Sequence, residues 1–154
     1  MVLGDSRRSI AGIAIAMDYR KFQTQRFWWH LVSAPIVWLP LPAIIALDIL
    51  GELYHQICFS IYGIAKVKRS AYIQIIDRNK LQYLNPLEKL GCMYCSYANG
   101  VLLYLKEIAG RTEKYWCGIK HQDKPGFKAQ GYQTEGDFVP YGDEAQFKEK
   151  YPLK

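Results

Sequence analysis

The longest hydrophobic stretch of the chain covers residues 27–65, in which Asp48 and Glu52 are the only formally charged residues. Within it, residues 31–50 form a run that, as a helix, is long enough to span a hydrocarbon core about 30 Å thick. Aromatic residues stand at the start of the stretch, where Phe27 opens the sequence FWW. Such rings favour the membrane–water interface, so the pattern predicts a membrane-embedded helical segment over residues 27–65.

Three prolines interrupt this run: Pro35, Pro40 and Pro42. Proline removes a backbone donor and kinks a helix, so a break is expected between Leu39 and Pro42. A continuous helix over residues 27–65 would be about 60 Å long at about 1.5 Å per residue, twice the thickness of the core. Since both flanks are basic, we expect a hairpin or re-entrant element with both ends in the cytoplasm. One simple crossing and a soluble helical core are the alternatives.

A second helical region follows a clear start signal. Asn85 can cap a helix that has Pro86 in its first position and Glu88 in its third. Gly110 offers a C-cap, and Thr112 can begin another helix that runs to about His121. Residues 66–121 are therefore expected to contain a helical hairpin.

The remaining residues, 122–154, are rich in Gly, Pro and aromatic side chains. We expect an extended tail that wraps on a partner or on the domain itself, because so many aromatics are unusual in a disordered segment. With a basic N-terminal arm over residues 1–26, the chain divides into four parts. The fold class expected is mostly α and membrane-anchored.

Charge adds to the membrane interpretation. The net charge is +6 and the pI is about 9.1, and the basic residues bracket the apolar stretch. This arrangement suits anionic lipid headgroups better than nucleic acid, for which no recognition motif is present. The residues expected to contact headgroups are Arg20, Lys21, Arg26, Lys66, Lys68 and Arg69.

Candidate chemistry lies in two closely spaced pairs of donors: Cys92 with Cys95, and Cys117 with His121. The spacing is typical of a zinc site, and on two adjacent helices each pair would project from one face. We expect structural zinc that clips the hairpin together. Buried core thiols, a disulfide or redox pair, and an iron–sulfur centre that also uses Cys58 are the alternatives.

Asp48, Glu52 and His55 form the second constellation, because their spacing places all three on one helical face. Ionisable groups in an apolar segment usually point at a partner or a polar cavity. The alternatives are a polar intramembrane face that meets partner helices or headgroups, a local hydrogen-bonded cluster, and a site for metal or proton transfer. The chain has no second copy of the Glu-x-x-His pattern that a di-iron site requires.

The motifs CxYCxYxNG, from Cys92 to Gly100, and RTExYWCxIKH, from Arg111 to His121, resemble those of a small uncharacterised family of bacterial membrane proteins. The likeness covers residues 48–121. It implies a protein of the bacterial inner membrane and transfers no catalytic residue, and none is expected. The function expected is an accessory or assembly subunit of a larger membrane complex, with other membrane-protein subunits as partners and its soluble part facing the cytoplasm. A redox protein or a metal-dependent membrane enzyme is the alternative.

Overall fold

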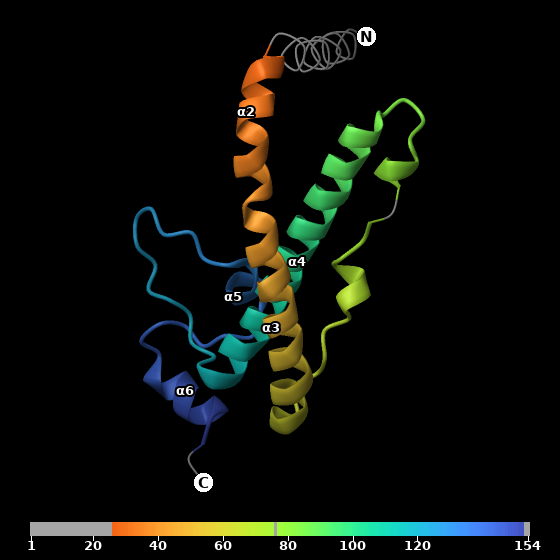
Figure 1. The fold of residues 1–154 in the computed structure, drawn as a ribbon. Coiled ribbons are helices and arrows are strands. Elements are labelled where there is room, and N and C mark those ends of the chain that lie inside the picture. The colour runs from red at the N-terminus through yellow and green to blue at the C-terminus, as the bar shows by residue number, and fades with distance from the viewer. Residues whose placement is uncertain (1–25, 76, 153–154) are drawn as a thin grey trace, which may run out of the picture. The chain divides into compact units, whose positions relative to one another are not determined.

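The computed structural model describes residues 26–75 and 77–152, so most of the expected N-terminal arm, including Arg20 and Lys21, lies outside the described residues. The described chain is mostly helical, as predicted, and contains no strand. Figure 1 shows the helices along the chain. They are α2 (Phe27–Trp38), α3 (Pro40–Tyr62), α4 (Pro86–Trp116), α5 (Gly131–Glu135) and α6 (Glu144–Lys150), with the short 3-10 turns η1 (Arg69–Ala71) and η2 (Arg78–Lys80). The described chain divides into two compact units, with the boundary between Ala43 and Ile44.

The apolar stretch is helical with an interruption at Leu39, as the prolines predicted. Pro40 and Pro42 fall in the first turn of α3, where a missing N–H costs little. Trp28–Tyr62 is nonetheless one helical run of 35 residues, the single candidate among the described residues that is long and apolar enough to cross a membrane. The hairpin expected inside residues 27–65 is therefore wrong. Kinking at proline changes the direction of a helix without reversing the chain.

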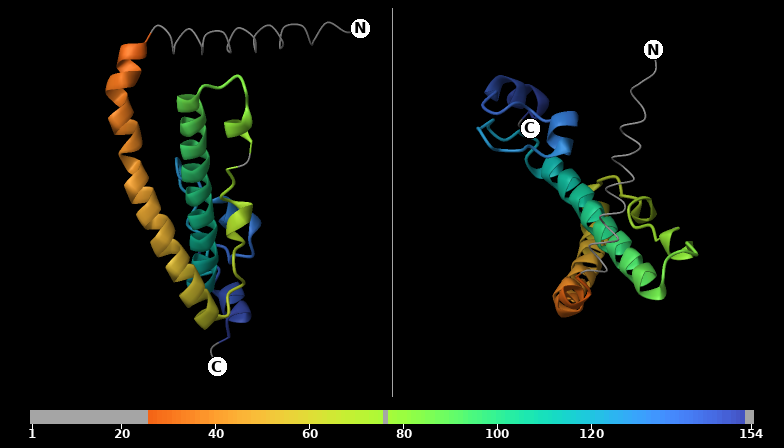
Figure 2. Two further views of the ribbon diagram at one scale, coloured as in Figure 1. Left: turned by 45° about the vertical axis from the view of Figure 1, so that its right-hand side comes forward. Right: turned by 90° about the horizontal axis from the view of Figure 1, so that it is seen from above.

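Gly63 ends α3. It adopts a φ of 68°, and the N–H of Ile64 bonds to the carbonyl of Phe59 at 3.0 Å, which is the six-to-one bond of a Schellman motif. Residues 63–85 then lead to the start of α4. Figure 2 shows this segment running beside α4.

Helices α3 and α4 run parallel, because residues further along α3 contact residues further along α4. Tyr62 near the end of α3 stacks on Tyr115 near the end of α4, with ring centroids 5.2 Å apart. Phe59, Val67, Tyr104 and Ile108 form one core cluster, and Ile44, Ala98 and Val101 form a second. A parallel pair needs a long connection, which explains the 63–85 return segment.

Gly100 permits that return segment to lie directly on α4. A Cβ at this position would come within 2.8 Å of the Tyr72 carbonyl oxygen and the Ile73 Cα. The segment thus occupies the groove that a side chain at residue 100 would fill.

The start of α4 is confirmed in detail. The Asn85 side chain accepts from the Glu88 N–H, and the Glu88 carboxylate accepts from the Asn85 N–H, each at 2.8 Å. This reciprocal capping box satisfies two donors that the helix itself cannot.

The end of the predicted hairpin is wrong, because α4 continues unbroken through Gly110 to Trp116. Thr112 does not cap a new helix; its hydroxyl donates to the Ile108 carbonyl at 2.9 Å inside the same helix. Gly110 does not end the helix but lets the Tyr132 ring approach it closely, since a Cβ there would lie 2.8 Å from that ring.

The C-terminal segment folds back onto the end of α4. Ile119 and Val139 form an isolated parallel bridge, and Phe138 and Val139 are buried. The expected extended tail thus includes two short helices, α5 and α6, and packs on the domain itself. Its aromatic residues supply part of that packing, with Tyr132 and Phe138 ring centroids 6.2 Å apart.

Candidate functional site

The polar face of α3 is the most extensively connected group of ionisable residues in the described part of the chain. Asp48 and His55 retain only 6% and 1% exposure, and Glu52 is half-buried. All three share the face that packs on α4 and the return segment. The helical spacing of these residues therefore brings them together, as predicted.

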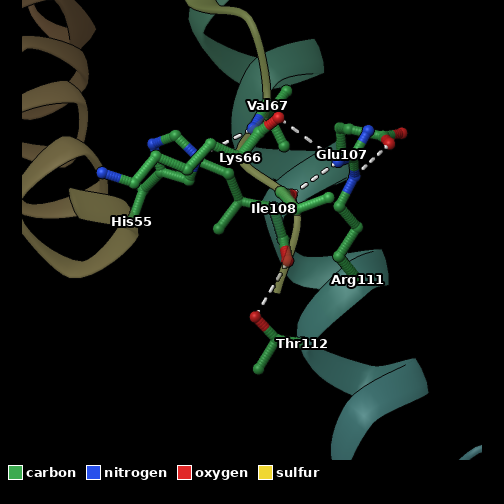
Figure 3. Close-up of polar contacts among 8 residues, drawn as sticks. His55, Lys66, Val67, Glu107, Ile108, Arg111 and Thr112 are labelled. Carbon is green, nitrogen blue, oxygen red and sulfur yellow. Dashed lines mark hydrogen bonds and ion pairs between the residues drawn. The ribbon is translucent and has the colours of Figure 1, made fainter. Parts of the chain in front are cut away.

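His55 is held by hydrogen bonds on both ring nitrogens. The Val67 N–H donates to Nε2 at 2.9 Å, which Figure 3 marks with a dashed line. Because Nε2 accepts, the proton of the neutral ring resides on Nδ1, which lies 2.9 Å from the Tyr104 hydroxyl. The imidazole is thus neutral and satisfied, with no nitrogen left for a metal.

Tyr104 passes the hydrogen-bond chain on to a carboxylate. Its hydroxyl accepts from His55 and donates to Glu52 Oε2 at 2.6 Å. Burial and this bond to Glu52 raise the pKa of Tyr104 well above its ordinary value, so the phenol remains a donor. Glu52 Oε1 accepts from Gln56 at 2.7 Å. The direction of every proton in the chain from Val67 to Glu52 follows.

Asp48 forms a second connection, to Arg69 and Tyr97. Its Oδ2 accepts from the Arg69 guanidinium at 2.5 Å and from the Tyr97 hydroxyl at 2.8 Å. The hydrogen bond to Asp48 is the main cause of the raised pKa of Arg69, and burial is the main cause of the raised pKa of Tyr97. The other carboxylate oxygen, Oδ1, is buried without a hydrogen-bond partner among the described residues.

Arg111 fastens the return segment to α4. Its Nε donates to Glu107 at 2.8 Å, and its Nη1 donates to the Ala65 carbonyl at 2.7 Å. Figure 3 shows Arg111 extending from α4 toward this backbone. The side chain stabilises the position of Val67 that His55 needs.

The two donor pairs of the predicted zinc site are not brought together. Cys92 and Cys95 lie within α4, whereas Cys117 follows its last residue. The 22 residues from Cys95 to Cys117 correspond to about 33 Å along a helix at about 1.5 Å per residue. No group of three or more His, Cys, Asp or Glu residues among those described could hold a metal ion. Zinc stays a prediction, and within one chain it requires a fold in which α4 breaks.

The thiol alternatives can be compared with the same geometry. All four cysteines are free, with Cys95 and Cys117 exposed and Cys58 and Cys92 half-buried. Cβ atoms three residues apart on a helix are about 5–6 Å apart, beyond the roughly 3.5–4.5 Å of a disulfide. Cys92 and Cys95 therefore cannot pair without distorting α4.

His121 and Glu113 belong to the contact between the C-terminal segment and α4. Glu113 accepts from the Tyr132 hydroxyl at 2.6 Å and from the Gln133 amide at 2.5 Å, and His121 Nε2 lies 3.7 Å from the same carboxylate. The hydrogen bond to Glu113, followed by burial, raises the pKa of Tyr132 to about 12. Glu113 thus anchors the tail.

The basic residues expected at headgroups have mixed surroundings. Arg26 and Lys68 are exposed. Lys66 Nζ donates to Gln56 Oε1 at 2.7 Å, and Arg69 pairs with Asp48. Lipid contact stays a prediction for all of them.

Sequence reasoning missed Tyr97 and Tyr104 as partners of the polar face. Their spacing of seven residues places them on one face of α4, a signal that was present in the sequence. Comparison with protein-family models, curated proteins and solved structures finds no match for this chain, so the resemblance to bacterial membrane proteins stays a prediction.

Proposed function

We propose that the protein is a membrane-anchored accessory or assembly subunit of a larger membrane complex. The observation that carries this proposal is the Trp28–Tyr62 helix, which is apolar and long enough to cross a bilayer. Only 6% of its most apolar 18-residue portion is buried within the described chain. A soluble domain rarely leaves so much contiguous apolar surface uncovered.

The anchor is the part of this helix that precedes Asp48, residues 27–47. At about 1.5 Å per residue, 21 residues span about 31 Å, which matches a hydrocarbon core of about 30 Å. Beyond Asp48, the largely irregular return segment lies beside α3 and carries Lys66, Lys68 and Arg69. Irregular backbone exposed to lipid is not tolerated in the hydrocarbon region, so we place the second half of α3, residues 63–73 and the chain from Tyr97 onward outside it as a head. Because α4 runs parallel to α3, its turns before Tyr97 lie on the anchor side of Asp48.

Two aliphatic residues of the head support a protein partner. Ile57 and Ile61 are four residues apart on α3 and are 50% and 72% exposed. They form an i, i+4 ridge of the kind that packs into the groove of another helix. We assign this ridge to an apolar helix of a partner subunit.

The free cysteines favour a head on the reducing, cytoplasmic side of a bacterial inner membrane. Cys95 and Cys117 are exposed thiols, and such thiols persist where glutathione and thioredoxin keep them reduced. In intact cells a membrane-impermeant maleimide should therefore label neither, and permeabilisation should expose both. Labelling in intact cells would place the head outside.

The anchor is tested by Ile36→Asp, near the centre of residues 27–47. A central Asp opposes insertion by about 2.5–3.5 kcal/mol, so the fraction of protein that floats with membranes should fall. Leu103→Asp is the matched control, because Leu103 is an exposed aliphatic residue of α4 that lies beyond the level of Asp48 and Tyr97. Equal flotation of both variants would contradict the anchor.

The partner surface is tested separately. After mild detergent extraction, the wild-type protein should elute in an assembly larger than one chain in its micelle, and Ile57→Asp with Ile61→Asp should release it while flotation stays unchanged. Elution of the wild type as a single chain would overturn the subunit role and leave the anchor intact.

A further inference from the structure

The middle of α4 lacks the charged side chains that an exposed helix usually carries. Between Lys89 and Lys106 the sequence has no Asp, Glu, Lys, Arg or His. Leu102 and Leu103 are nonetheless 52% and 55% exposed, and Cys95 is exposed as well. Absence of charge together with exposed aliphatic side chains is typical of the core of a protein interface. This side of α4 is therefore suited to contact with another protein.

The same side of α4 carries half of a metal site. Cys92 and Cys95 are three residues apart within the helix, so their side chains lie close together and can bind one ion between them. Leu102 and Leu103 follow Cys95 by about two helical turns and share its side of the helix. A closed zinc site needs four ligands, with Zn–S distances of about 2.3 Å for thiolates. The cysteine pair supplies two of them.

The chain cannot supply the other two ligands itself. Cys117 follows the end of α4, about 33 Å from Cys95 along the helix at about 1.5 Å per residue. Within residues 26–75 and 77–152, no group of three or more His, Cys, Asp or Glu residues could hold a metal ion. A zinc site at Cys92 and Cys95 is therefore complete only with ligands from a second chain.

Membrane anchoring restricts how a second copy can supply those ligands. When two copies cross one bilayer in the same direction, the axis of a two-fold dimer runs along the membrane normal, so their α4 helices run in the same direction. Residues nearest such an axis meet their own equivalents. Cys92 and Cys95 of one copy then meet the same pair of the second copy, and Cys117 lies too far along α4 to take part.

We propose that two copies of this chain share one Zn²⁺ ion, bound by Cys92 and Cys95 of each copy, with Leu102 and Leu103 packed between the two α4 helices. The four cysteines bind as thiolates, and their protons pass to solvent. The reducing side of the membrane, to which the proposed function assigns the head, keeps them available for the metal. This inference rests on the proposed anchor, because the anchor sets the orientation of the two copies.

The test uses the full-length protein in mild detergent, with a reductant and added zinc. Native mass spectrometry should find a dimer of this chain that carries one zinc ion, and metal analysis should give one zinc per two chains. A chelator should convert the dimer to a metal-free monomer with unchanged helix content by circular dichroism. One zinc per chain, or a monomer in the presence of zinc, would overturn the proposal.

Two cysteine variants locate the metal. Cys95→Ser should lower the zinc affinity, measured by competition with a chromophoric chelator, by at least about 100-fold, because even changes outside the ligand shell cost about 10–100-fold. Cys117→Ser removes the other exposed thiol and should leave zinc and dimer unchanged. Loss of zinc in Cys117→Ser, or its retention in Cys95→Ser, would assign the metal to another set of ligands.

Leu102→Asp tests the shared side of α4 without a change to the ligands. Two aspartates would face each other near the axis, so the dimer should dissociate at a concentration at least about tenfold higher than the wild type does. Ile61→Asp is the matched control, because Ile61 is an exposed aliphatic residue of α3, and it should leave the dimer unchanged. Equal dissociation of both variants would contradict contact through α4.

Thiol reactivity gives a second readout in permeabilised cells. Bound zinc should slow the reaction of Cys95 with maleimide relative to that of Cys117, and a chelator should remove the difference. Equal rates without the chelator would contradict the site. Flotation of the wild-type protein reports on the anchor alone. A protein that floats but binds no zinc defeats only this inference, whereas one that does not float defeats the proposed function. The mass of the assembly separates a dimer of this chain from a complex with other subunits.

Discussion

Two tyrosine–glutamate hydrogen bonds of equal length connect different parts of the molecule. Tyr104 donates to Glu52 at 2.6 Å between α4 and α3, and Tyr132 donates to Glu113 at 2.6 Å between the C-terminal segment and α4. Tyr104 is fully buried and also bonds to His55, whereas Tyr132 is half-buried. The surroundings therefore decide how much each bond contributes to stability, since a buried polar group that loses its partner has no water to replace it.

The largest effect is expected from removal of the Tyr104 side chain. Tyr104→Ala should lower the free energy of unfolding by about 3–5 kcal/mol. It leaves a cavity at the centre of the α3–α4 contact and removes the hydrogen-bond partner of His55 and Glu52. Denaturant titration in detergent, followed by tryptophan fluorescence, measures this. Tyr83→Ala removes an exposed tyrosine and should change stability by less than about 0.5 kcal/mol. Similar losses in both variants would contradict the assigned core.

Removal of single hydroxyl groups compares the two bonds directly. Tyr104→Phe should lower the free energy of unfolding by about 1–3 kcal/mol, because it removes a partner from buried His55 and from half-buried Glu52. Tyr132→Phe should lower it by about 0.5–1.5 kcal/mol. The ring packing is kept in both variants. An equal or larger loss for Tyr132→Phe would show that the tail contact is as well shielded from water as the α3–α4 contact.

Two glycines of α4 test whether the tail is held against the helix. Gly110→Ala should destabilise the tail contact by about 1–3 kcal/mol, because its methyl group would overlap the Tyr132 ring. Gly91→Ala meets nothing within 4 Å and should stabilise α4 by about 0.5–1 kcal/mol through helix propensity. Limited proteolysis at residues 122–130 reports on the first effect, and thermal unfolding on the second. Stabilisation by both substitutions would mean that Tyr132 does not pack on Gly110.

The local features of the fold could be predicted from the sequence. The capping box at Asn85 depends on residues only three positions apart, and the interruption at Leu39 follows from proline chemistry. The shared face of Asp48 and His55 follows from helical periodicity. Each of these signals acts within one or two turns, so distant parts of the chain do not change it.

The end of α4 and the partners of the polar face could not be predicted in this way. Gly110 has the local signature of a helix C-cap. In the fold, however, the absence of a side chain at Gly110 lets the ring of Tyr132, 22 residues further on, pack closely against α4. The turn predicted at Gly110, on which the zinc prediction depended, is therefore wrong, because α4 continues to Trp116. Likewise, Arg69 reaches Asp48 across 21 residues. Such contacts depend on the path of residues 63–85, which no local pattern specifies.

The smallest effect is expected at the ion pair between Asp137 and Lys150, which are 2.6 Å apart and connect α6 to the preceding part of the tail. The hydrogen bond to Lys150 lowers the pKa of Asp137 below its ordinary value of 3.8. A carboxyl with a depressed pKa stabilises the fold above the unfolded pKa, and this contribution is lost as the pH falls through the folded pKa. Proteolysis of the tail should therefore be slower in the wild type than in Lys150→Gln at pH 5. The difference should shrink as the pH falls below 3.8 and vanish once the pH is below the folded pKa of Asp137, because protonation of Asp137 removes the charge that Lys150 binds. Since other carboxylates titrate in both proteins, only the difference between them reports on this pair. A difference that persists at the acidic end would show that Lys150 acts through its bond to the Asp137 carbonyl and that the ion pair contributes nothing to holding the tail.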